Sequence, residues 1–332
     1  MKQRLATWVE QGWYGTGKRL LWLLPLSALV ARVARQRLLR FREQALVPPV
    51  PVLVVGNITV GGTGKTPLVE ALCAQAAHRG LTVAIISRGY GANPPHFPWR
   101  VTPEQTASVA GDEPLMLAQK TQMPVFIAPE RDAALRAALA SSPDVVISDD
   151  GLQHYALPRS AEIIVLDAKR WLGNGRCLPA GPLREPAQRL NEVDWVVVNG
   201  VSETSLPKAI TMVLEAGDFW QPSTGVRLSP ESFVAKHPRV HAVAGIGHPE
   251  RFFTSLQALG LAISPHAFAD HHPYTKADLS FAPAHPIVMT DKDAVKAAHL
   301  VGQQAWVFSI KAKLPETFFD AVFNQLLKES ST

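Results

Sequence analysis

The chain has 332 residues, of which 47% are hydrophobic and 18% are charged, and its formal net charge is +5. This composition is typical of a globular protein and excludes disordered, collagen-like and coiled-coil chains. At ~150 residues per domain, the length predicts two domains. The two cysteines, Cys73 and Cys177, are too few for a disulfide framework and form no zinc-type pair, which favours a reducing cytoplasm.

The excess positive charge lies in an N-terminal arm, which we place at residues 1–47. Residues 1–46 hold nine basic and two acidic side chains, whereas the rest of the chain holds 24 basic and 26 acidic ones. The longest mostly apolar run, 20–31, is shorter than the ~20 residues that span a bilayer, and arginines follow it closely. We therefore expect neither a transmembrane helix nor a cleaved signal peptide. A slightly acidic body also argues against a nucleic-acid-binding ATPase.

Within the arm, residues 26–42 separate apolar from basic side chains when they are projected on a helix. One sector of about 100° holds the apolar side chains of Leu26, Leu29, Val30 and Val33, with Arg32, Arg35 and Arg42 on the opposite side. This pattern predicts an amphipathic helix on an anionic membrane surface. The alternative is a helix packed on the body with an exposed basic face.

Beyond the arm, short apolar runs alternate with helical patterns. Strands are expected at 52–55, 81–86, 125–128, 145–147, 163–166 and 195–198, and helices at 67–79, 113–121 and 130–139. Strands separated by such helices indicate βαβ units and a parallel sheet, so the predicted class is α/β. Weaker signals follow, with strands at 240–245, 285–290 and 305–310 and helices at 249–259 and 318–328. We expect a P-loop domain at 48–200 and a smaller α/β domain at 201–332 that closes a cleft.

A glycine-rich segment joins the first predicted strand to the first predicted helix. It resembles the Walker A pattern G-x-x-x-x-G-K-[ST], except that Thr59 stands at the first glycine position. A strand, a glycine-rich turn and a helix N-terminus together direct N–H groups at an anion. The expected contacts to the nucleotide are Thr59, Val60, Gly61, Gly62, Thr63, Gly64, Lys65 and Thr66. In this pattern Lys65 reaches the β- and γ-phosphates, and the Thr66 hydroxyl binds Mg²⁺.

We expect the nucleotide to be ATP rather than GTP. The segment 290–293 (TDKD) is the only string similar to the N-K-x-D guanine-reading motif, and it lacks the asparagine.

A second apolar strand, 145–147, runs into Asp149 and Asp150 as a Walker B element does, so Asp150 is expected at Mg²⁺. Gln153 and His154 follow at the same sheet edge, where open α/β sheets bind ligands. Arg88 follows the strand at 81–86 and is expected near the phosphates or the substrate. The alternatives are an ordinary strand-to-loop turn for the aspartates and a salt-bridged loop arginine for Arg88.

Two acidic side chains at a helix start are candidates for the chemistry. Asp112 could accept the proton of an attacking hydroxyl, and Glu113 could bind magnesium, although acids also cap helices. In the second half, Asp270, His271 and His272 form the densest ionisable cluster. Neighbouring side chains of an extended segment face opposite ways, so one histidine is expected in the site, and we favour His271. A metal site is less favoured because no third ligand is near.

Together these strings closely resemble the tetraacyldisaccharide 4′-kinase (lipid A 4′-kinase) family. The strings that carry the resemblance are 56–67, 87–91 (SRGYG), 111–114 (GDEP), 149–154 (DDGLQH), 178–186 (LPAGPLREP), 268–272 (FADHH) and 290–296 (TDKDAVK). They extend over most of the chain and occur in the family's order. Small departures are Asp291, where the family's string has glutamate, and Ser160, where an acid is common.

The resemblance implies a kinase that uses ATP and Mg²⁺ to phosphorylate the 4′-hydroxyl of a tetraacylated glucosamine disaccharide, a step of lipid A synthesis. It implies a peripheral enzyme on the cytoplasmic face of the inner membrane, with no nucleic-acid ligand and no obligate protein partner. Asp112 would be the catalytic aspartate, and His271 and Lys65 would be the other catalytic residues. Magnesium would be held by Thr66, Glu113 and Asp150, and the substrate by Arg88, Asp149, Gln153, His154 and Asn174.

The competing class is a membrane-associated P-loop ATPase switch that acts on a protein partner. This class accounts for the glycine-rich loop and for the basic arm. It gives no role to Asp112, to the 270–272 cluster or to the 178–186 string.

Overall fold

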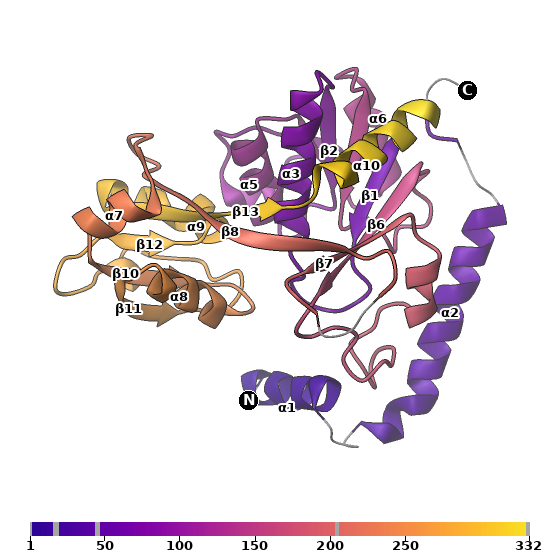
Figure 1. Cartoon of the computed structure of the whole chain (residues 1–332), viewed down its shortest axis with the longest axis horizontal. Helices are drawn as coiled ribbons and strands as arrows, with labels where there is room; N and C mark the ends of the chain where they lie inside the picture. Colours follow the sequence, from indigo (N-terminus) through magenta and orange to yellow (C-terminus); the bar gives the residue numbers. More distant parts are fainter. Residues whose placement is uncertain (1, 16–19, 44–46, 203–205, 330–332) are drawn as a thin grey trace. The chain divides into compact units, whose positions relative to one another are not determined.

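The computed structural model describes residues 2–15, 20–43, 47–202 and 206–329. The chain divides into two units, and each is built from segments that are distant in sequence (Figure 1). Unit 1 combines Met1–Arg88, Glu130–Val213 and Lys313–Thr332, and unit 2 combines Gly89–Pro129 with Leu214–Ala312. The predicted boundary at residue 200 is therefore wrong in two places. Residues 89–129 pack with the second unit, and the C-terminal helix packs with the first.

The core of unit 1 is a parallel sheet. In spatial order its described strands are β7 (Trp195–Asn199), β6 (Ala161–Asp167), β1 (Val52–Gly56), β5 (Val145–Asp149) and β2 (Val83–Ser87). Every residue of β1, β2, β5 and β6 is buried, which explains why these strands appear in the sequence as continuous apolar runs. β1 and β5 are neighbours, with Val55 opposite Asp149, so their carboxyl ends lie together.

The described helices of unit 1 come from all three of its chain segments. They are α1 (Lys2–Tyr14), η1 (Leu21–Leu23) and α2 (Leu24–Glu43) in the arm, then α3 (Lys65–His78), α6 (Arg131–Leu139), η2 (Ala187–Asn191) and α10 (Glu316–Glu329). α3 connects β1 to β2 and packs on β1, β2 and β5, as a βαβ crossover requires. The predicted α/β class with a P-loop-type arrangement is confirmed.

The C-terminal helix α10 lies beside α3 (Figure 1). Arg79, directly after α3, pairs with Glu316 at 2.7 Å and with Asp320 at 2.6 Å, and its guanidinium lies 5.3 Å from the ring centroid of Phe323. The exposed ion pairs contribute little to stability, so the apolar face of α10 supplies most of the attachment.

We predict that Phe323→Ala destabilises the protein by about 3–5 kcal/mol, because the phenylalanine side chain is 2% exposed and its removal leaves a cavity. Denaturant unfolding measures the change. Leu327→Ala on the same helix is the control, since Leu327 is 36% exposed and should cost under about 1 kcal/mol. Equal losses in the two variants would contradict the packing of α10 on unit 1.

Unit 2 is a second α/β structure. β8 (Ile210–Trp220) carries the chain from unit 1 into unit 2, where the strand order is β11 (Ala262–Ala267), β10 (Arg239–Ala244), β12 (Ile287–Met289), β13 (Ala305–Lys313) and β8. β10 to β13 pair in parallel, and β9 (Arg227–Leu228) pairs with β8 in the antiparallel sense. The other elements are α7 (Pro230–Lys236), α8 (Pro249–Ala258), η3 (Ala277–Leu279), α9 (Asp291–Val301) and η4 (Gly302–Gln304).

The inserted segment of unit 2 contains β3 (Trp99–Val101), α4 (Ala107–Ala110), α5 (Asp112–Thr121) and β4 (Val125–Ile127). β3 and β4 pair in the antiparallel sense, and α5 packs on both strands and on α9. This last contact matters for the site, because it brings the first turn of α5 to the first turns of α9. The sequence did not predict β3, β8, β9, β11, α4, α7 or α9 as elements.

Candidate functional site

The phosphate-binding loop connects β1 to α3 in unit 1. Gly61 has φ +99° and Gly64 has φ +96°, conformations that favour glycine and that turn the backbone N–H groups inward. In the described structure, α3 begins at Lys65, and its N-cap residue Gly64 has no side chain to cap it, so the first N–H groups of this helix are available to an anion. The Val60 N–H, in contrast, donates to the Pro182 carbonyl at 2.9 Å.

Three side chains hold the loop in shape. The Asn57 amide donates to the Gly61 carbonyl at 3.1 Å, and the Asn199 amide donates to the Thr63 carbonyl at 3.1 Å. The Arg170 guanidinium donates to the Gly62 carbonyl at 2.6 Å. These contacts occupy carbonyl oxygens of the loop, so they fix its backbone without using its N–H groups. The loop therefore fits a phosphate chain.

Lys65 and Asp150 form the charged centre of this part of the site. The Lys65 ammonium lies 3.3 Å from Asp150 Oδ1, and an Arg184 guanidinium nitrogen lies 3.4 Å from the same oxygen. Burial alone would raise the pKa of Asp150, but the charges of Lys65 and Arg184 outweigh it and lower the pKa. Asp150 is therefore a carboxylate at neutral pH. Its positive φ of 52° directs the chain sharply away from β5.

Asp149, the last residue of β5, is 2% exposed and lies beside a buried arginine. The Arg131 guanidinium donates to the Asp149 carbonyl at 3.3 Å and to the Asp150 carbonyl at 3.4 Å. Burial lowers the pKa of Arg131 to about 10, although the two aspartates oppose this. His154 Nε2 accepts a hydrogen bond from the backbone N–H of Arg131 at 3.0 Å. Burial and the nearby positive charges, including that of Arg88, lower the pKa of His154, so this imidazole is neutral at pH 7.

Gln153 and Asn174 use their amide groups on the protein itself. Gln153 donates to the Asn57 carbonyl at 3.0 Å and to Glu185 at 2.7 Å, and it accepts from Arg184 at 3.3 Å. Asn174 donates to the Gly12 carbonyl at 3.2 Å and to the Ala180 carbonyl at 2.8 Å. These contacts give Gln153 a role in bracing the phosphate loop and Asn174 a role in attaching α1. Their predicted contact with substrate stays a prediction.

The residues of unit 1 fit Mg²⁺ bound together with phosphates. Among the described residues no three His, Cys, Asp or Glu side chains form a metal-binding group. Mg²⁺ in phosphotransferases is held largely by the substrate's phosphates and water, with one or two protein oxygens. The Thr66 hydroxyl, in the first turn of α3, and the Asp150 carboxylate are oxygens of this kind.

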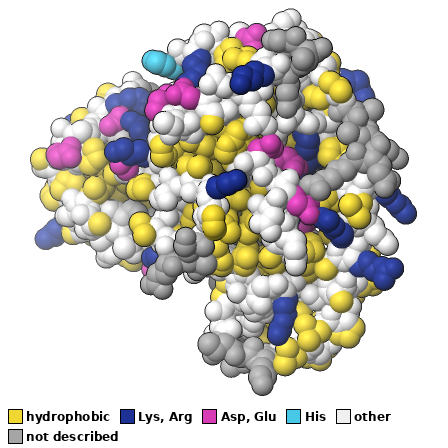
Figure 2. All heavy atoms as spheres, turned by 45° about the vertical axis from the view of Figure 1, so that its right-hand side comes forward, with side chains coloured by type: hydrophobic (Ala, Val, Ile, Leu, Met, Phe, Trp, Pro, Cys, Tyr) yellow, Lys and Arg dark blue, Asp and Glu magenta, His cyan; other side chains and the backbone are white. Residues whose placement is uncertain are grey.

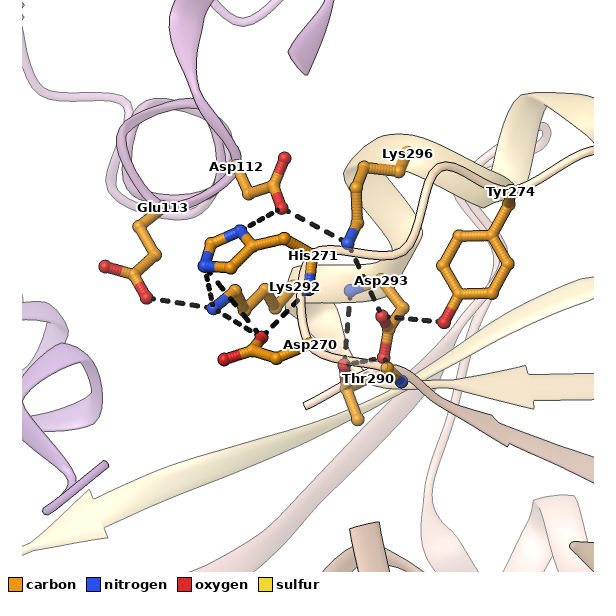
Figure 3. A network of polar contacts seen from close by, with 10 residues as sticks. Asp112, Glu113, Asp270, His271, Tyr274, Thr290, Lys292, Asp293 and Lys296 are labelled. Atoms are coloured by element: carbon orange, nitrogen blue, oxygen red, sulfur yellow. Dashed lines mark hydrogen bonds and ion pairs between the residues drawn. The ribbon is translucent and has the colours of Figure 1, made fainter. Parts of the chain in front are cut away.

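A cluster of acidic and basic side chains lies in unit 2, where the first turn of α5 meets α9 and the 268–274 loop (Figure 3). We call it the acid–base cluster, and its members are Asp112, Glu113, Asp270, His271, Lys292 and Lys296. Asp112 is the first residue of α5, and its Oδ2 lies 3.0 Å from His271 Nδ1 and 3.2 Å from Lys296 Nζ. In Figure 3 the other carboxylate oxygen points away from both partners. His271 has φ +60°, a conformation in which histidine is over-represented and which turns its ring toward α5. The Tyr90 ring lies 5.4 Å from the His271 ring.

Lys292 joins the remaining acidic groups of the cluster. Its ammonium lies 3.1 Å from Glu113 Oε1, 3.2 Å from Asp270 Oδ1 and 3.4 Å from His271 Nε2. Burial would lower the pKa of Lys292, but the two carboxylates outweigh it and raise the pKa. Because an ammonium can only donate, His271 Nε2 is the acceptor, and Nδ1 carries the proton directed at Asp112. Glu113, expected at magnesium, thus pairs with Lys292 within unit 2.

The neighbouring His272 has other partners. Its Nε2 lies 3.4 Å from Asp278, and its ring packs against Phe268 and Tyr274. Of the two adjacent histidines, His271 is therefore the one that contacts Asp112.

The arm exposes the apolar stripe that the sequence predicts. Leu26, Leu29 and Val33 of α2 are 49%, 55% and 44% exposed, whereas Ser27 is buried and donates to the Cys177 carbonyl at 2.7 Å. Leu38 is also buried, so α2 attaches to unit 1 by a different face. On the face that includes α2, hydrophobic and basic side chains lie next to one another (Figure 2). None of the described helices is both long and apolar enough to cross a bilayer.

Several basic residues of these clusters were not among the predicted site residues: Arg131, Arg170, Arg184, Lys292 and Lys296. The spacing of Lys292 and Lys296 was a usable signal, because residues four apart on a helix share one face. This signal was lost because 290–296 was not predicted to begin a helix. Arg131 gave no signal, since its burial depends on packing against β5.

Comparisons with known proteins identify one family over nearly the whole chain. The family model for tetraacyldisaccharide-1-phosphate 4′-kinase matches residues 19–328. The tetraacyldisaccharide 4′-kinase of Alcanivorax borkumensis is 52% identical over 324 residues, which are 97% of this chain and 98% of that protein. The protein of the same name from Pseudomonas putida W619 is 46% identical over 98% of this chain and 97% of its own length.

Among solved structures, the crystal structure of Aquifex aeolicus LpxK in complex with ATP is similar, with a TM-score of 0.77 and 28% identity. The similarity covers 92% of this chain and 99% of that one. Sequence and fold thus agree along nearly the whole length, and the chain belongs to the tetraacyldisaccharide-1-phosphate 4′-kinase family.

Proposed function

We propose that this kinase transfers the γ-phosphate of ATP to the 4′-hydroxyl of a tetraacylated glucosamine disaccharide 1-phosphate, with Asp112 acting on the hydroxyl. The observation that carries the proposal is the 3.0 Å contact between Asp112 and His271. A carboxylate oriented by an imidazole can serve as the positioned base that a phosphotransferase uses on an alcohol acceptor.

The residues of unit 1 bind and orient ATP. The N–H groups of the loop from Gly61 to Thr66 surround the phosphates, and the Lys65 ammonium stabilises the charge that develops on the transferring group. Thr66 and Asp150 would hold Mg²⁺, which would neutralise phosphate charge further. The segment 290–293 has no role in reading the base, because Asp293 is fully buried among groups of unit 2.

The residues of unit 2 act on the acceptor. Asp112 accepts a hydrogen bond from the 4′-hydroxyl and then takes its proton as the oxygen attacks phosphorus. The His271 Nδ1–H holds one oxygen of Asp112 and stabilises its negative charge before the transfer. Glu113, Arg88, Asp149 and His154 remain candidates for metal and substrate contacts.

The rival class, a P-loop ATPase switch, is tested by measuring ADP release. The kinase predicts that ADP release requires the tetraacylated disaccharide 1-phosphate and equals phosphorylated lipid in amount. Equal ADP release in the absence of lipid, raised by a protein fraction instead, would contradict the kinase proposal.

The proposal also places the enzyme on the cytoplasmic face of the inner membrane, with α2 in contact with the lipid surface. Three exposed apolar side chains and the neighbouring arginines support this. Burial of Leu26, Leu29 and Val33 in the interface would add to the attraction of anionic headgroups, which is about 1 kcal/mol per nearby basic residue. Salt screens charges but not apolar burial, so binding should weaken yet persist at high salt.

We predict that changing Leu26, Leu29 and Val33 together to serine releases the protein from anionic vesicles in a sedimentation assay. The apparent KM for vesicle-borne lipid should rise more than the KM for ATP, because the surface concentration of the enzyme falls. Changing Val201, Val213 and Val226 to serine is the matched control, since these side chains are 88%, 44% and 45% exposed outside the arm.

A different result would identify α2 as a purely structural helix. The serine variant would then lose thermal stability, while vesicle binding per folded molecule stayed at the level of the control.

A further inference from the structure

Lys296 lies in the acid–base cluster and has no role in the reaction described so far. Its ammonium lies 3.2 Å from Asp112 Oδ2, the oxygen that also lies 3.0 Å from His271 Nδ1 (Figure 3). His271 is hydrogen-bonded to this oxygen and the Lys296 ammonium forms an ion pair with it, and two partners from different directions restrict the rotation of a carboxylate more than one partner does. In this arrangement, Asp112 Oδ1 is the oxygen that remains for the acceptor hydroxyl.

The position of Lys296 is itself determined by a buried network. Its side chain is 9% exposed, and its ammonium lies 5.5 Å from the centroid of the Tyr274 ring and 3.9 Å from Asp293. Asp293 is fully buried and accepts hydrogen bonds from the Gly245 N–H at 3.0 Å, the Tyr274 hydroxyl at 2.9 Å and the Thr290 hydroxyl at 2.7 Å. These contacts link α9 to the end of β10 and to the 268–274 loop. The buried Asp293 network therefore holds both the helix that carries Lys296 and the loop that carries His271.

Stability alone does not explain this ion pair. Breaking a buried pair is costly, but replacing it with apolar side chains is often neutral or stabilising. α5 and α9 are also joined by Lys120 and Asp291, 2.9 Å apart, at a place that does not involve Asp112. A buried ammonium at the reacting carboxylate therefore indicates a role in the reaction.

We propose that Lys296 is a positioning residue, which together with His271 holds Asp112 Oδ2 so that Oδ1 faces the acceptor hydroxyl. This inference rests on the proposed kinase function and deepens it. Lys296 does not contact the substrate in this account, because its ammonium is buried and acts through Asp112.

The test compares Lys296→Met and Lys296→Arg with Lys120→Met as the matched control. Labelled phosphate transfer from ATP to the tetraacylated disaccharide 1-phosphate in mixed micelles gives kcat and KM for each variant. We expect Lys296→Met to lower kcat by about 10- to 100-fold, a range typical of strongly coupled contacts. The KM for ATP should stay within about twofold, arginine should restore most of kcat, and Lys120→Met should leave kcat near that of the wild type.

A double-mutant cycle with Asp112→Asn separates positioning from general support of the fold. If Lys296 acts through the carboxylate, Lys296→Met should change the residual kcat of Asp112→Asn by less than about twofold. Equal losses in both backgrounds would overturn the proposal, as would a wild-type kcat in Lys296→Met. Should the methionine variant fail to fold, Lys296→Gln replaces it in the same cycle.

The wild type and the Lys296 variants test the proposed kinase function and the role of Lys296 separately. A wild-type protein that transfers no phosphate to the lipid would contradict the proposed function. An active wild type together with an unaffected Lys296→Met would contradict only the role of Lys296.

Discussion

Replacing Asp112 with alanine is expected to lower kcat by about 10²–10⁴, the usual contribution of a positioned general base. The carboxylate is the group that takes the proton of the acceptor hydroxyl, so its loss affects the chemical step. ATP binding should be largely kept, because the phosphate loop belongs to unit 1 and Asp112 to unit 2. Steady-state kinetics gives kcat, and binding of a fluorescent ATP analogue gives the affinity.

The matched control for this substitution is Asp278→Asn. Asp278 is also a carboxylate of unit 2 that pairs with a histidine, His272 at 3.4 Å, but it lies outside the acid–base cluster. Its kcat should stay near the wild-type value. A normal kcat in Asp112→Ala, or an equal loss in the two variants, would remove Asp112 from the mechanism.

Replacing Lys65 with alanine is expected to cost about 3 kcal/mol or more in the transition state, which is a loss of ~100-fold or more in kcat/KM. The reason is that the ammonium stabilises charge on the transferring phosphoryl group. In the structure the Lys65 side chain is 15% exposed and its ammonium pairs with Asp150 at 3.3 Å, so its position at the loop is set by a fixed partner.

Lys169→Ala is the control for Lys65, because Lys169 is an exposed lysine that follows β6, the strand next to β1. It should keep nearly normal kinetics. Unchanged turnover in Lys65→Ala, with thermal stability also unchanged, would contradict the assignment of the loop to phosphate binding.

Much of unit 1 could be predicted because its strands are covered on both faces. Continuous apolar runs such as 52–55 and 145–147 have few alternatives to a buried parallel strand, and turn glycines mark where they end. The phosphate loop was also predictable, because strand, glycines and lysine are adjacent in sequence. Elements whose formation depends on residues adjacent in sequence could therefore be identified from the sequence.

The division into units could not be predicted, because it depends on contacts between distant segments. β8 carries Gly217 and several polar residues, and β11 contains Pro265, which edge strands tolerate, so neither gave a clear strand pattern. Residues 89–129 belong to unit 2, but their amino-acid composition does not indicate this. Only the packing of α5 on α9 reveals it.

The acid–base cluster was predicted only in part, because it too depends on contacts between distant segments. Asp112 and His271 are identified by short strings, but sequence alone did not decide between His271 and His272. The φ of +60° at His271 and the contact of His272 with Asp278 make this decision, and both depend on how the 268–274 loop lies on α9. Lys296 is found only when α9 is recognised as a helix.

Phosphate transfer to the lipid is followed with ATP labelled in its γ-phosphate. The purified protein is incubated with labelled ATP, Mg²⁺ and tetraacylated disaccharide 1-phosphate, and the position of the label on the extracted lipid is determined by mass spectrometry after fragmentation. The account predicts one labelled phosphate per lipid on the 4′ oxygen, with the transfer rate lowered by ~10²–10⁴ in Asp112→Ala. Label released as inorganic phosphate with none on the 4′ oxygen would contradict it.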